Sequence, residues 1–390
     1  MSPSTLRARH VPDVAELQAL GRAHGLDAVG VTVAEPFTST RRHLEHRKAE
    51  GLHGGMAFTY RKPERSTDPR QALPDARSLV VAARSYRRGP RPEVDGPVGA
   101  VARYAWVDHY GELRSGLSAI AERLRDEGWR TRVLADDNAL VDREAARRAG
   151  LGWYGKNANL LLPGQGSWFV LGSVVTDAPL ASHVAEPVAD GCGTCTRCLD
   201  GCPTGAIVAP GVVDARRCLA WLLQMEGSFP REHREALGDR IYGCDDCQEV
   251  CPPNRRAARL DAADEPDEPE EPGRSAGAPG IGAETHVDMV DLLATPDDEL
   301  LARHGRWYIA RRQARHLRRN ALVVLGNIGD PTDPRVIAAV RGALAHDDPL
   351  VRAHAVWAAR RMGRADLLPA DDADPTVREE LAAPVEVRAL

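Results

Sequence analysis

The first half of the chain alternates helix-like and strand-like patterns of hydrophobic residues. Apolar residues recur at helical spacing in residues 12–25 and 113–128, and each pattern stops at a glycine, Gly25 and Gly128. Short apolar runs at 28–33 and 78–83, rich in valine and alanine, predict strands. This order of elements predicts one α/β or α+β domain over residues 1–187.

The last ninety residues show only helical patterns. Residues 317–329 and 351–363 match at an offset of 34, which pairs Ala321 with Ala355 and Gly329 with Gly363. A repeat of this length predicts a HEAT-like array of helices over residues 301–390. The alternative is two unrelated amphipathic helices that share alanine and glycine.

Two segments of different composition separate these parts. Residues 188–258 hold every cysteine, among Gly, Pro and Asp, and contain too few apolar residues to fold without a metal. From Asp261 to Glu271 there are seven acidic residues and no basic one, interleaved with proline. We expect residues 259–300 to be an extended, solvated linker region.

Composition and the terminal sequence indicate the compartment. The 390-residue chain has a formal net charge of −5 and begins without a basic leader or an apolar export segment. Its longest apolar run, near 168–175, is far too short to cross a bilayer. We therefore expect a cytoplasmic protein with no membrane segment. In a reducing cytosol, clustered cysteines indicate metal or redox chemistry rather than disulfides.

The cysteine spacing narrows that chemistry. The stretch "CGTCTRCLDGCP" has the spacing C-x2-C-x2-C-x3-C-P, typical of bacterial ferredoxins, in which the fourth cysteine binds a second [4Fe–4S] cluster. A second run, "CDDCQEVCPP", ends on the same Cys-Pro pair. By the pseudo-symmetry of two-cluster ferredoxins, one cluster has the ligands Cys192, Cys195, Cys198 and Cys251, and the other Cys202, Cys218, Cys244 and Cys247. The alternative is two zinc ions, which would not require the paired endings.

Two neighbouring clusters transfer single electrons, so we expect a site in the first domain that receives them. The densest candidate is Leu134–Gly172, which combines acids, six glycines, Lys156, Asn157 and Asn159. It contains neither a dinucleotide-binding fingerprint nor a P-loop. Read structurally instead, "ADDN" caps the helix that follows and the glycines are ordinary turns.

Several motifs, taken in order, resemble the epoxyqueuosine reductase family over nearly the whole chain. They are "GGMAF", "RAGLGWYGKN", "GSWFVLG", "CGTCTRCLDGCPTGAI", "RIYGCDDCQEVCP" and "RRNALVVLGN". The resemblance implies an α+β protein with an N-terminal α/β cobalamin-binding reductase domain, a ferredoxin-like two-cluster domain and a HEAT-like tail. It also implies a substrate, an epoxide on the wobble base of a queuosine-type tRNA, reduced at the last step of queuosine synthesis.

The resemblance assigns roles to individual residues. Removing the epoxide oxygen takes two electrons and two protons, so an acid is expected at the site. The family's proton donor matches Asp136, although the adjacent Asp137 leaves open which carboxyl group acts. The cobalamin contacts implied by the family are Asp136, Leu160, Leu171, Ala220 and Asp245. Gly111 stands where the family usually has a histidine, so no role of that histidine is carried over.

A basic run near the start of the tail is the candidate surface for tRNA. Residues 303–319 contain seven arginines, two histidines and no acid, and we expect them to contact phosphate. Trp307 and Tyr308 are expected to stack on unpaired bases. The predicted tRNA contacts are Arg315, Arg318 and Arg319, with Gln224 added by the resemblance. The alternative is a solvated helix face without a partner.

Two other functions stay open at this point. A cobalamin-dependent reductase of a small epoxide or halide would share the cofactors but would not bind tRNA. An iron–sulfur electron-transfer protein would use its helical tail to dock a protein and would bind no cobalamin. In the leading hypothesis the protein is a monomer that receives electrons from an unidentified low-potential donor.

Overall fold

The computed structural model describes residues 9–182, 187–263 and 283–388. The middle of the predicted acidic linker, residues 264–282, lies outside the described residues. The start of the chain, on which the expectation about export rests, also lies partly outside them, since residues 1–8 are not described. In the described part, no helix is both long and apolar enough to span a membrane.

The first domain is built on a four-stranded sheet with the strand order β1-β2-β7-β4, in which all pairs are antiparallel. The antiparallel pairing makes this domain α+β. The strands are β1 (Ala28–Val33), β2 (Ser78–Ser85), β4 (Thr131–Ala135) and β7 (Phe169–Thr176). Both predicted strands are present. In β2, Leu79 and Val81 face one core while Val80 and Ala82 face another, as the two-residue period of a strand requires.

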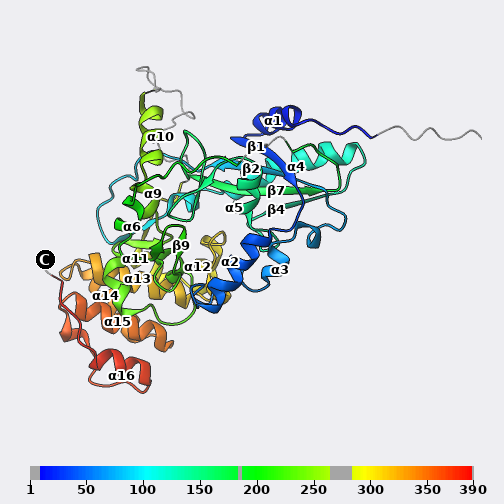
Figure 1. Cartoon of the computed structure of the whole chain (residues 1–390). Coiled ribbons are helices and arrows are strands. Elements are labelled where there is room, and N and C mark those ends of the chain that lie inside the picture. The colour runs from blue at the N-terminus through cyan, green and yellow to red at the C-terminus, as the bar shows by residue number, and fades with distance from the viewer. Residues whose placement is uncertain (1–8, 183–186, 264–282, 389–390) are drawn as a thin grey trace, which may run out of the picture.

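Helices cover both faces of this sheet (Figure 1). The two predicted helices pack on one face, and the helix at 142–148 packs on the other. The helices are α1 (Val14–Ala23), α2 (Thr38–Ala49), α3 (Pro63–Ser66), α4 (His109–Asp126) and α5 (Asp142–Arg148). Helix α5 approaches β1 closely at Gly30, where a Cβ atom would lie 2.3 Å from the carbonyl oxygen of Ala149. Glycine is therefore required at that position.

The cysteine-containing segment forms short elements between turns. They are α6 (Arg197–Asp200), β8 (Ile207–Ala209), β9 (Val212–Val213), α7 (Leu219–Leu222), α8 (Arg231–Leu237), β10 (Arg240–Tyr242), α9 (Asp246–Glu249) and α10 (Pro252–Ala263). Two pairs of short antiparallel strands form small sheets. Strand β8 pairs with β9, and in the first domain β5 (Trp153–Tyr154) pairs with β6 (Leu160–Leu161).

A second sheet joins the first domain, the cysteine-containing segment and the predicted linker region. Its order is β10-β3-β11, with β3 (Val98–Val101) from the first domain and β11 (His286–Asp288) from the predicted linker. Helices α11 (Met289–Ala294) and α12 (Asp297–Arg303) follow directly. The expectation of an extended linker over 259–300 is therefore wrong at both described ends, because α10 continues to Ala263 and residues from 286 onward form regular structure.

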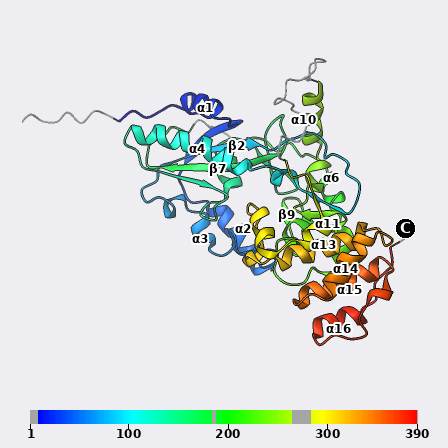
Figure 2. The ribbon, with the colours of Figure 1, turned by 180° about the vertical axis from the view of Figure 1, so that it is seen from behind.

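The tail consists of packed helices at the end of the molecule remote from α1 (Figure 2). They are α13 (Arg315–Ile328), α14 (Pro334–Leu344), α15 (Pro349–Arg361) and α16 (Pro375–Ala382). The two segments that match at an offset of 34 are α13 and α15, which pack against each other. One hydrophobic core includes Val101, Leu219, Ile241, Leu292 and Leu325, so the tail is not a separate body.

Candidate functional site

The eight cysteines are free thiols. The pKa of Cys251 is raised to about 11, chiefly by burial and then by charge repulsion from Cys192, Cys198 and Cys195. In the same way burial, followed by charge repulsion from Cys218, Cys202 and Cys198, raises the pKa of Cys247. Burial and, among the cysteines, Cys218 raise the pKa of Cys244. Because Cys198 of the first predicted set also acts on Cys247 of the second, the assignment of each cysteine to one cluster stays a prediction.

These raised pKa values show why the groups require a cation. Four thiolates held together in a partly buried space repel one another, and each has lost solvation. Positively charged iron removes both penalties, since a coordinating thiol is deprotonated outright. The residues present therefore fit two [4Fe–4S] clusters, each with four cysteines.

Asp136 occupies the loop that follows β4, at the edge of the main sheet. Its backbone is in the left-handed region with φ of 54°, which is unusual for a residue other than glycine. Its side chain is open to solvent, yet loss of solvation raises its pKa, with a lowering effect from Arg114 and a raising effect from Asp137. The carboxyl group of Asp136 therefore keeps its proton to a higher pH than a free aspartate does.

The rest of this loop is held firmly. Asp137 Oδ1 accepts a hydrogen bond of 2.8 Å from the backbone amide of Ala139, so its carboxylate belongs to a turn. Ser66 Oγ donates to the carbonyl oxygen of Asn138 at 2.6 Å, and the Val141 amide donates to the Ser66 carbonyl at 3.0 Å. Helix α5 begins only at Asp142 and has no side-chain cap, so the alternative in which "ADDN" caps a helix is wrong.

Two further polar side chains, those of Asp142 and Tyr110, lie near Asp136. Asp142 has one oxygen, Oδ1, that is buried without a hydrogen-bond partner among the described residues. Burial, and then the charge of Asp136, raises its pKa well above the usual range. Burial, Asp136 and Asp142 also raise the pKa of Tyr110. Neither residue was singled out from the sequence; the position of Asp142 six residues after Asp136, within the same motif, was the available signal.

Beside Asp136, the first residues of strand β7 are not paired with β4. Strand β4 ends where Ala135 pairs with Gly172, and β7 continues to Phe169 without a partner on that side among the described residues. Leu171 lies on this free edge, and its side chain points into the core. The unpaired end of β7 and the carboxyl group of Asp136 are the features of this site that could hold the cobalamin implied by the family resemblance. Leu171 would meet it through its backbone.

The other predicted cobalamin contacts lie in different settings. Leu160 is buried in β6, and Ala220 lies half-buried in α7 next to Cys218. Burial raises the pKa of Asp245 to about 6, although its Oδ2 accepts a 2.9 Å hydrogen bond from the Arg103 amide and lies 3.7 Å from the Arg103 guanidinium. The Asp245 side chain is therefore already bound to Arg103.

The structure corrects part of the predicted tRNA surface. Arg319 is fully buried in α13, and its guanidinium donates to the carbonyl oxygens of Met225, Gly227, Leu222 and Leu223. Arg318 is buried as well, and it donates to the carbonyl oxygens of Leu293 and Thr295 and to Asp297. The expectation that both arginines contact phosphate is wrong. They bind the carboxyl-terminal ends of α7 and α11, where helix dipoles favour cations.

The remaining residues of the basic run differ in their exposure. Trp307 is buried against Tyr242, with ring centroids 4.3 Å apart, so the expectation that it stacks on a base is also wrong. Tyr308 is 57% exposed, and Arg306 is exposed without a side-chain partner among the described residues. Arg315 is half-exposed, 3.4 Å from Asp348. Gln224 donates to the hydroxyl of Tyr104 at 3.4 Å.

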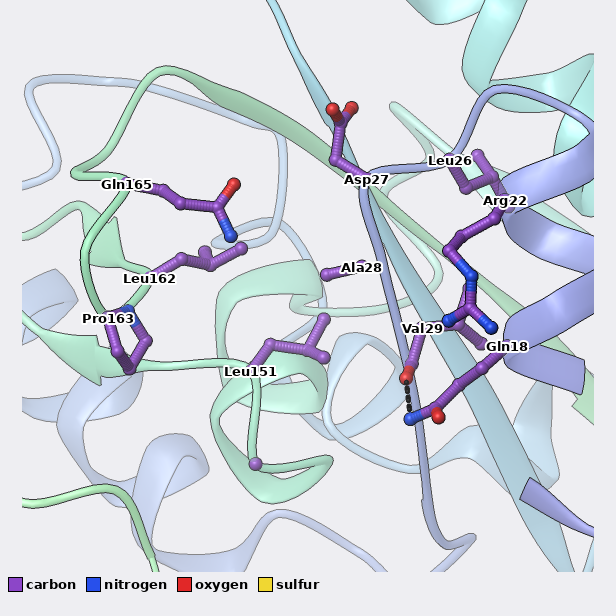
Figure 3. A pocket seen from close by; sticks show the side chains of 11 residues that line it. Gln18, Arg22, Leu26, Asp27, Ala28, Val29, Leu151, Leu162, Pro163 and Gln165 are labelled. Carbon is purple, nitrogen blue, oxygen red and sulfur yellow. Dashed lines mark hydrogen bonds between the residues drawn. The ribbon is translucent and has the colours of Figure 1, made fainter. Parts of the chain in front are cut away.

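A cavity of about 310 Å³ lies apart from these residues, between α1, β1 and the turn after β6. Figure 3 shows Gln18, Arg22 and Asp27 on one side of it and Pro163 and Gln165 on the other. None of the individually predicted site residues lines this cavity. It is therefore not the site described above.

The fold and the site define an iron–sulfur oxidoreductase that carries a helical-repeat tail. Three family models match the chain: "Epoxyqueuosine reductase QueG, DUF1730" over residues 66–137, "4Fe-4S double cluster binding domain" over 191–254 and "HEAT repeats" over 307–383. The first of these includes both Ser66 and Asp136.

Individual proteins named epoxyqueuosine reductase are similar over almost the full length. The protein of Xanthomonas campestris pv. campestris is 36% identical, with 93% of this chain and 100% of that protein covered. The protein of Bacillus subtilis (strain 168) is 32% identical, with 95% and 90% covered. A crystal structure of epoxyqueuosine reductase with a tRNA-Tyr epoxyqueuosine-modified stem loop is 30% identical with a TM-score of 0.79, covering 94% of this chain and 96% of that one.

The chain belongs to the epoxyqueuosine reductase family. This confirms the α+β fold class, the HEAT-like tail, and the predicted cofactors, which are two [4Fe–4S] clusters and cobalamin. It also decides against the zinc alternative for the cysteines.

Proposed function

We propose that this protein reduces epoxyqueuosine to queuosine at the wobble position of tRNA, with Asp136 as the proton donor. The observation that carries the proposal is the placement of Asp136. Its carboxyl group has a raised pKa, its backbone is in the left-handed region, and it lies beside the end of β7 that is not paired with β4. A related structure, 30% identical, is described with an aspartate-bearing catalytic loop swung out of the active site, which supports a catalytic loop at this place.

The chemistry divides between the cofactors and the chain. Cobalamin, when bound, supplies low-potential cobalt that reduces the substrate, and the clusters supply its electrons. The conversion of an epoxide to an alkene releases one water and consumes two electrons and two protons. An alkoxide is a poor leaving group, so a protonated carboxyl group at Asp136 assists the C–O cleavage. Asp137 is held in its turn by the Ala139 amide and is less able to take that role.

The reaction is tested directly on the modified nucleoside. Cluster-loaded protein is incubated anaerobically with cobalamin, a strong reductant and epoxyqueuosine-containing tRNA. The tRNA is then digested, and the masses of its nucleosides are measured by mass spectrometry. We expect the modified guanosine to lose the mass of one oxygen. An unchanged nucleoside, with cobalamin bound and reduced, would instead favour a reductase of small epoxides or halides.

The exposed part of the basic run carries the proposed contact with tRNA. Tyr308 and Arg306 are available at the surface, and Arg311 and Arg312 next to them both have positive φ, of 50° and 54°. Consecutive left-handed residues other than glycine are costly, and such strain is often found at functional sites. Arg315 and Gln224 remain proposed contacts at its margin.

Charge reversal at Arg306 tests this surface. Arg306→Glu should weaken tRNA binding and lower the slope of log affinity against log salt by about 1, because one phosphate contact is lost. Tyr308→Ala should cost about 1–3 kcal/mol of binding without changing the slope, since stacking releases no counterions. The control is Arg341→Glu, another exposed arginine of the tail. Equal effects from Arg341→Glu would show a diffuse charge effect rather than a contact.

The setting of the reaction follows from this substrate. We propose that the protein works in the cytoplasm, where tRNA is modified, and that it acts as a monomer. Its electrons come from a low-potential donor that has not been identified.

A further inference from the structure

Lys156 reaches from the first domain to the turn that holds the first cysteine group. Its Nζ donates to the carbonyl oxygen of Gly193 at 2.7 Å and to that of Cys195 at 2.9 Å. No carboxylate lies within ion-pairing distance of this ammonium among the described residues. Its positive charge is therefore directed at the turn between Cys192 and Cys195 and is not cancelled nearby.

The next residue contacts the second cysteine group. Asn157 is buried, and its Nδ2 donates to the carbonyl oxygen of Cys247 at 3.2 Å. Its Oδ1 accepts a hydrogen bond of 3.1 Å from the Asn159 amide, which fixes the orientation of the side chain. Two consecutive residues thus bind the backbones of both cysteine groups, one through a charged donor and one through a neutral donor.

We infer that Lys156 raises the reduction potential of the cluster held by Cys192, Cys195, Cys198 and Cys251 relative to its neighbour. A cluster gains one negative charge on reduction, so a nearby ammonium stabilises the reduced form more than the oxidised form. Lys156 is half-buried, and its charge is screened less than that of an exposed side chain. The neutral amide of Asn157 gives the other cluster a smaller effect.

The arrangement makes the first cluster the better electron acceptor of the two. Its turn, with exposed Gly191, Gly193 and Thr194, lies at the surface, where an external donor can approach. The inference rests on the two-cluster part of the proposed function and is independent of the tRNA substrate.

The test is an anaerobic redox titration of cluster-loaded protein, free of cobalamin and tRNA, followed by electron paramagnetic resonance. In Lys156→Met the potential of one cluster should fall while that of the other stays unchanged, and Lys156→Arg should retain the native value. Lys156→Gln keeps a donor without the charge, so it should behave like Lys156→Met. Iron content is measured for every variant. If Lys156→Met loses a cluster, the potentials of Lys156→Gln are used to test the inference instead.

The matched control is Arg197→Gln. Arg197 is an exposed cation next to Cys198, so its loss removes the same charge from a screened position and should shift the potential less. Unchanged potentials in Lys156→Met and Lys156→Gln, or an equal fall of both clusters, would overturn the inference. A shift in Arg197→Gln as large as that in Lys156→Met would overturn it too. Failure of the tRNA assay would leave this result intact, because no tRNA is present.

Discussion

Asp136→Asn is expected to lower turnover on epoxyqueuosine-containing tRNA by about 10²–10⁴-fold, the usual contribution of a general acid. The amide keeps the size of the side chain but has no proton to give to the leaving oxygen. Cobalamin loading, followed by its absorption spectrum, should be unchanged, because the open edge of β7 does not depend on the carboxyl group. Single-turnover rates with saturating tRNA measure the effect.

Asp137→Asn is the matched control for this prediction. The asparagine side-chain oxygen can still accept from the Ala139 amide, so the turn and the rate should be largely retained. A large loss of rate in Asp137→Asn with little loss in Asp136→Asn would assign the proton to Asp137. Loss of cobalamin from Asp136→Asn would make Asp136 a structural residue.

The pH dependence has a definite sign. Loss of solvation raises the pKa of Asp136, and the protonated form is the active one. The rate should therefore fall as the pH rises through this pKa, at a higher pH than an ordinary solvated aspartate would give. The falling limb should disappear from the residual rate of Asp136→Asn.

Arg319→Met is expected to destabilise the protein by about 3–5 kcal/mol, the range for removing one partner of a buried charged network. The substitution removes a donor from the carbonyl oxygens of Leu222, Leu223, Met225 and Gly227, of which Leu223 keeps the side-chain amide of Asn320 as a donor. Burial and the nearby Arg234 lower the pKa of Arg319 to about 9, so it is still charged at neutral pH. Thermal unfolding of the cluster-loaded protein measures the loss.

Arg311→Met is the comparison for this prediction, since Arg311 is exposed and pairs only with Glu226 at the surface. It should change stability by less than about 1 kcal/mol. Because the carbonyls of Leu222 and Leu223 belong to the segment that carries Cys218 and Ala220, Arg319→Met should also lower the iron content. A stable Arg319→Met protein that had lost only tRNA affinity would restore the phosphate role.

The sequence predicted the features that depend on local spacing. The two [4Fe–4S] clusters follow from two short motifs, and the pairing of α13 with α15 follows from the 34-residue offset. The roles of Arg318 and Arg319 were not predictable from the run of charges, because residues 316–326 of α13 are buried all around. The polar residues of α13 are spaced as on an amphipathic helix, but the segments after α7 and α11 cover them, so the sequence pattern does not separate buried arginines from exposed ones.

The linker was misjudged for a related reason. Its acidic, proline-containing composition is concentrated before residue 272, whereas β11 finds its partner, β3, almost two hundred residues earlier. Pairing over such a separation leaves no local pattern in a strand of three residues. Likewise, Asp136, Asp142 and Tyr110 lie near one another in the folded protein, and the sequence pattern did not predict this.

The mixed sheet β10-β3-β11 has a consequence for how the chain can be divided. Each strand comes from a different segment, and β3 loses a neighbour if the cysteine segment is cut away or if the chain is truncated before β11. Truncation before β11 would also remove most of the core shared by Trp106, Leu222 and Leu322. The molecule should therefore melt in one cooperative step, and its tail should not be separable as an autonomous, exchangeable module.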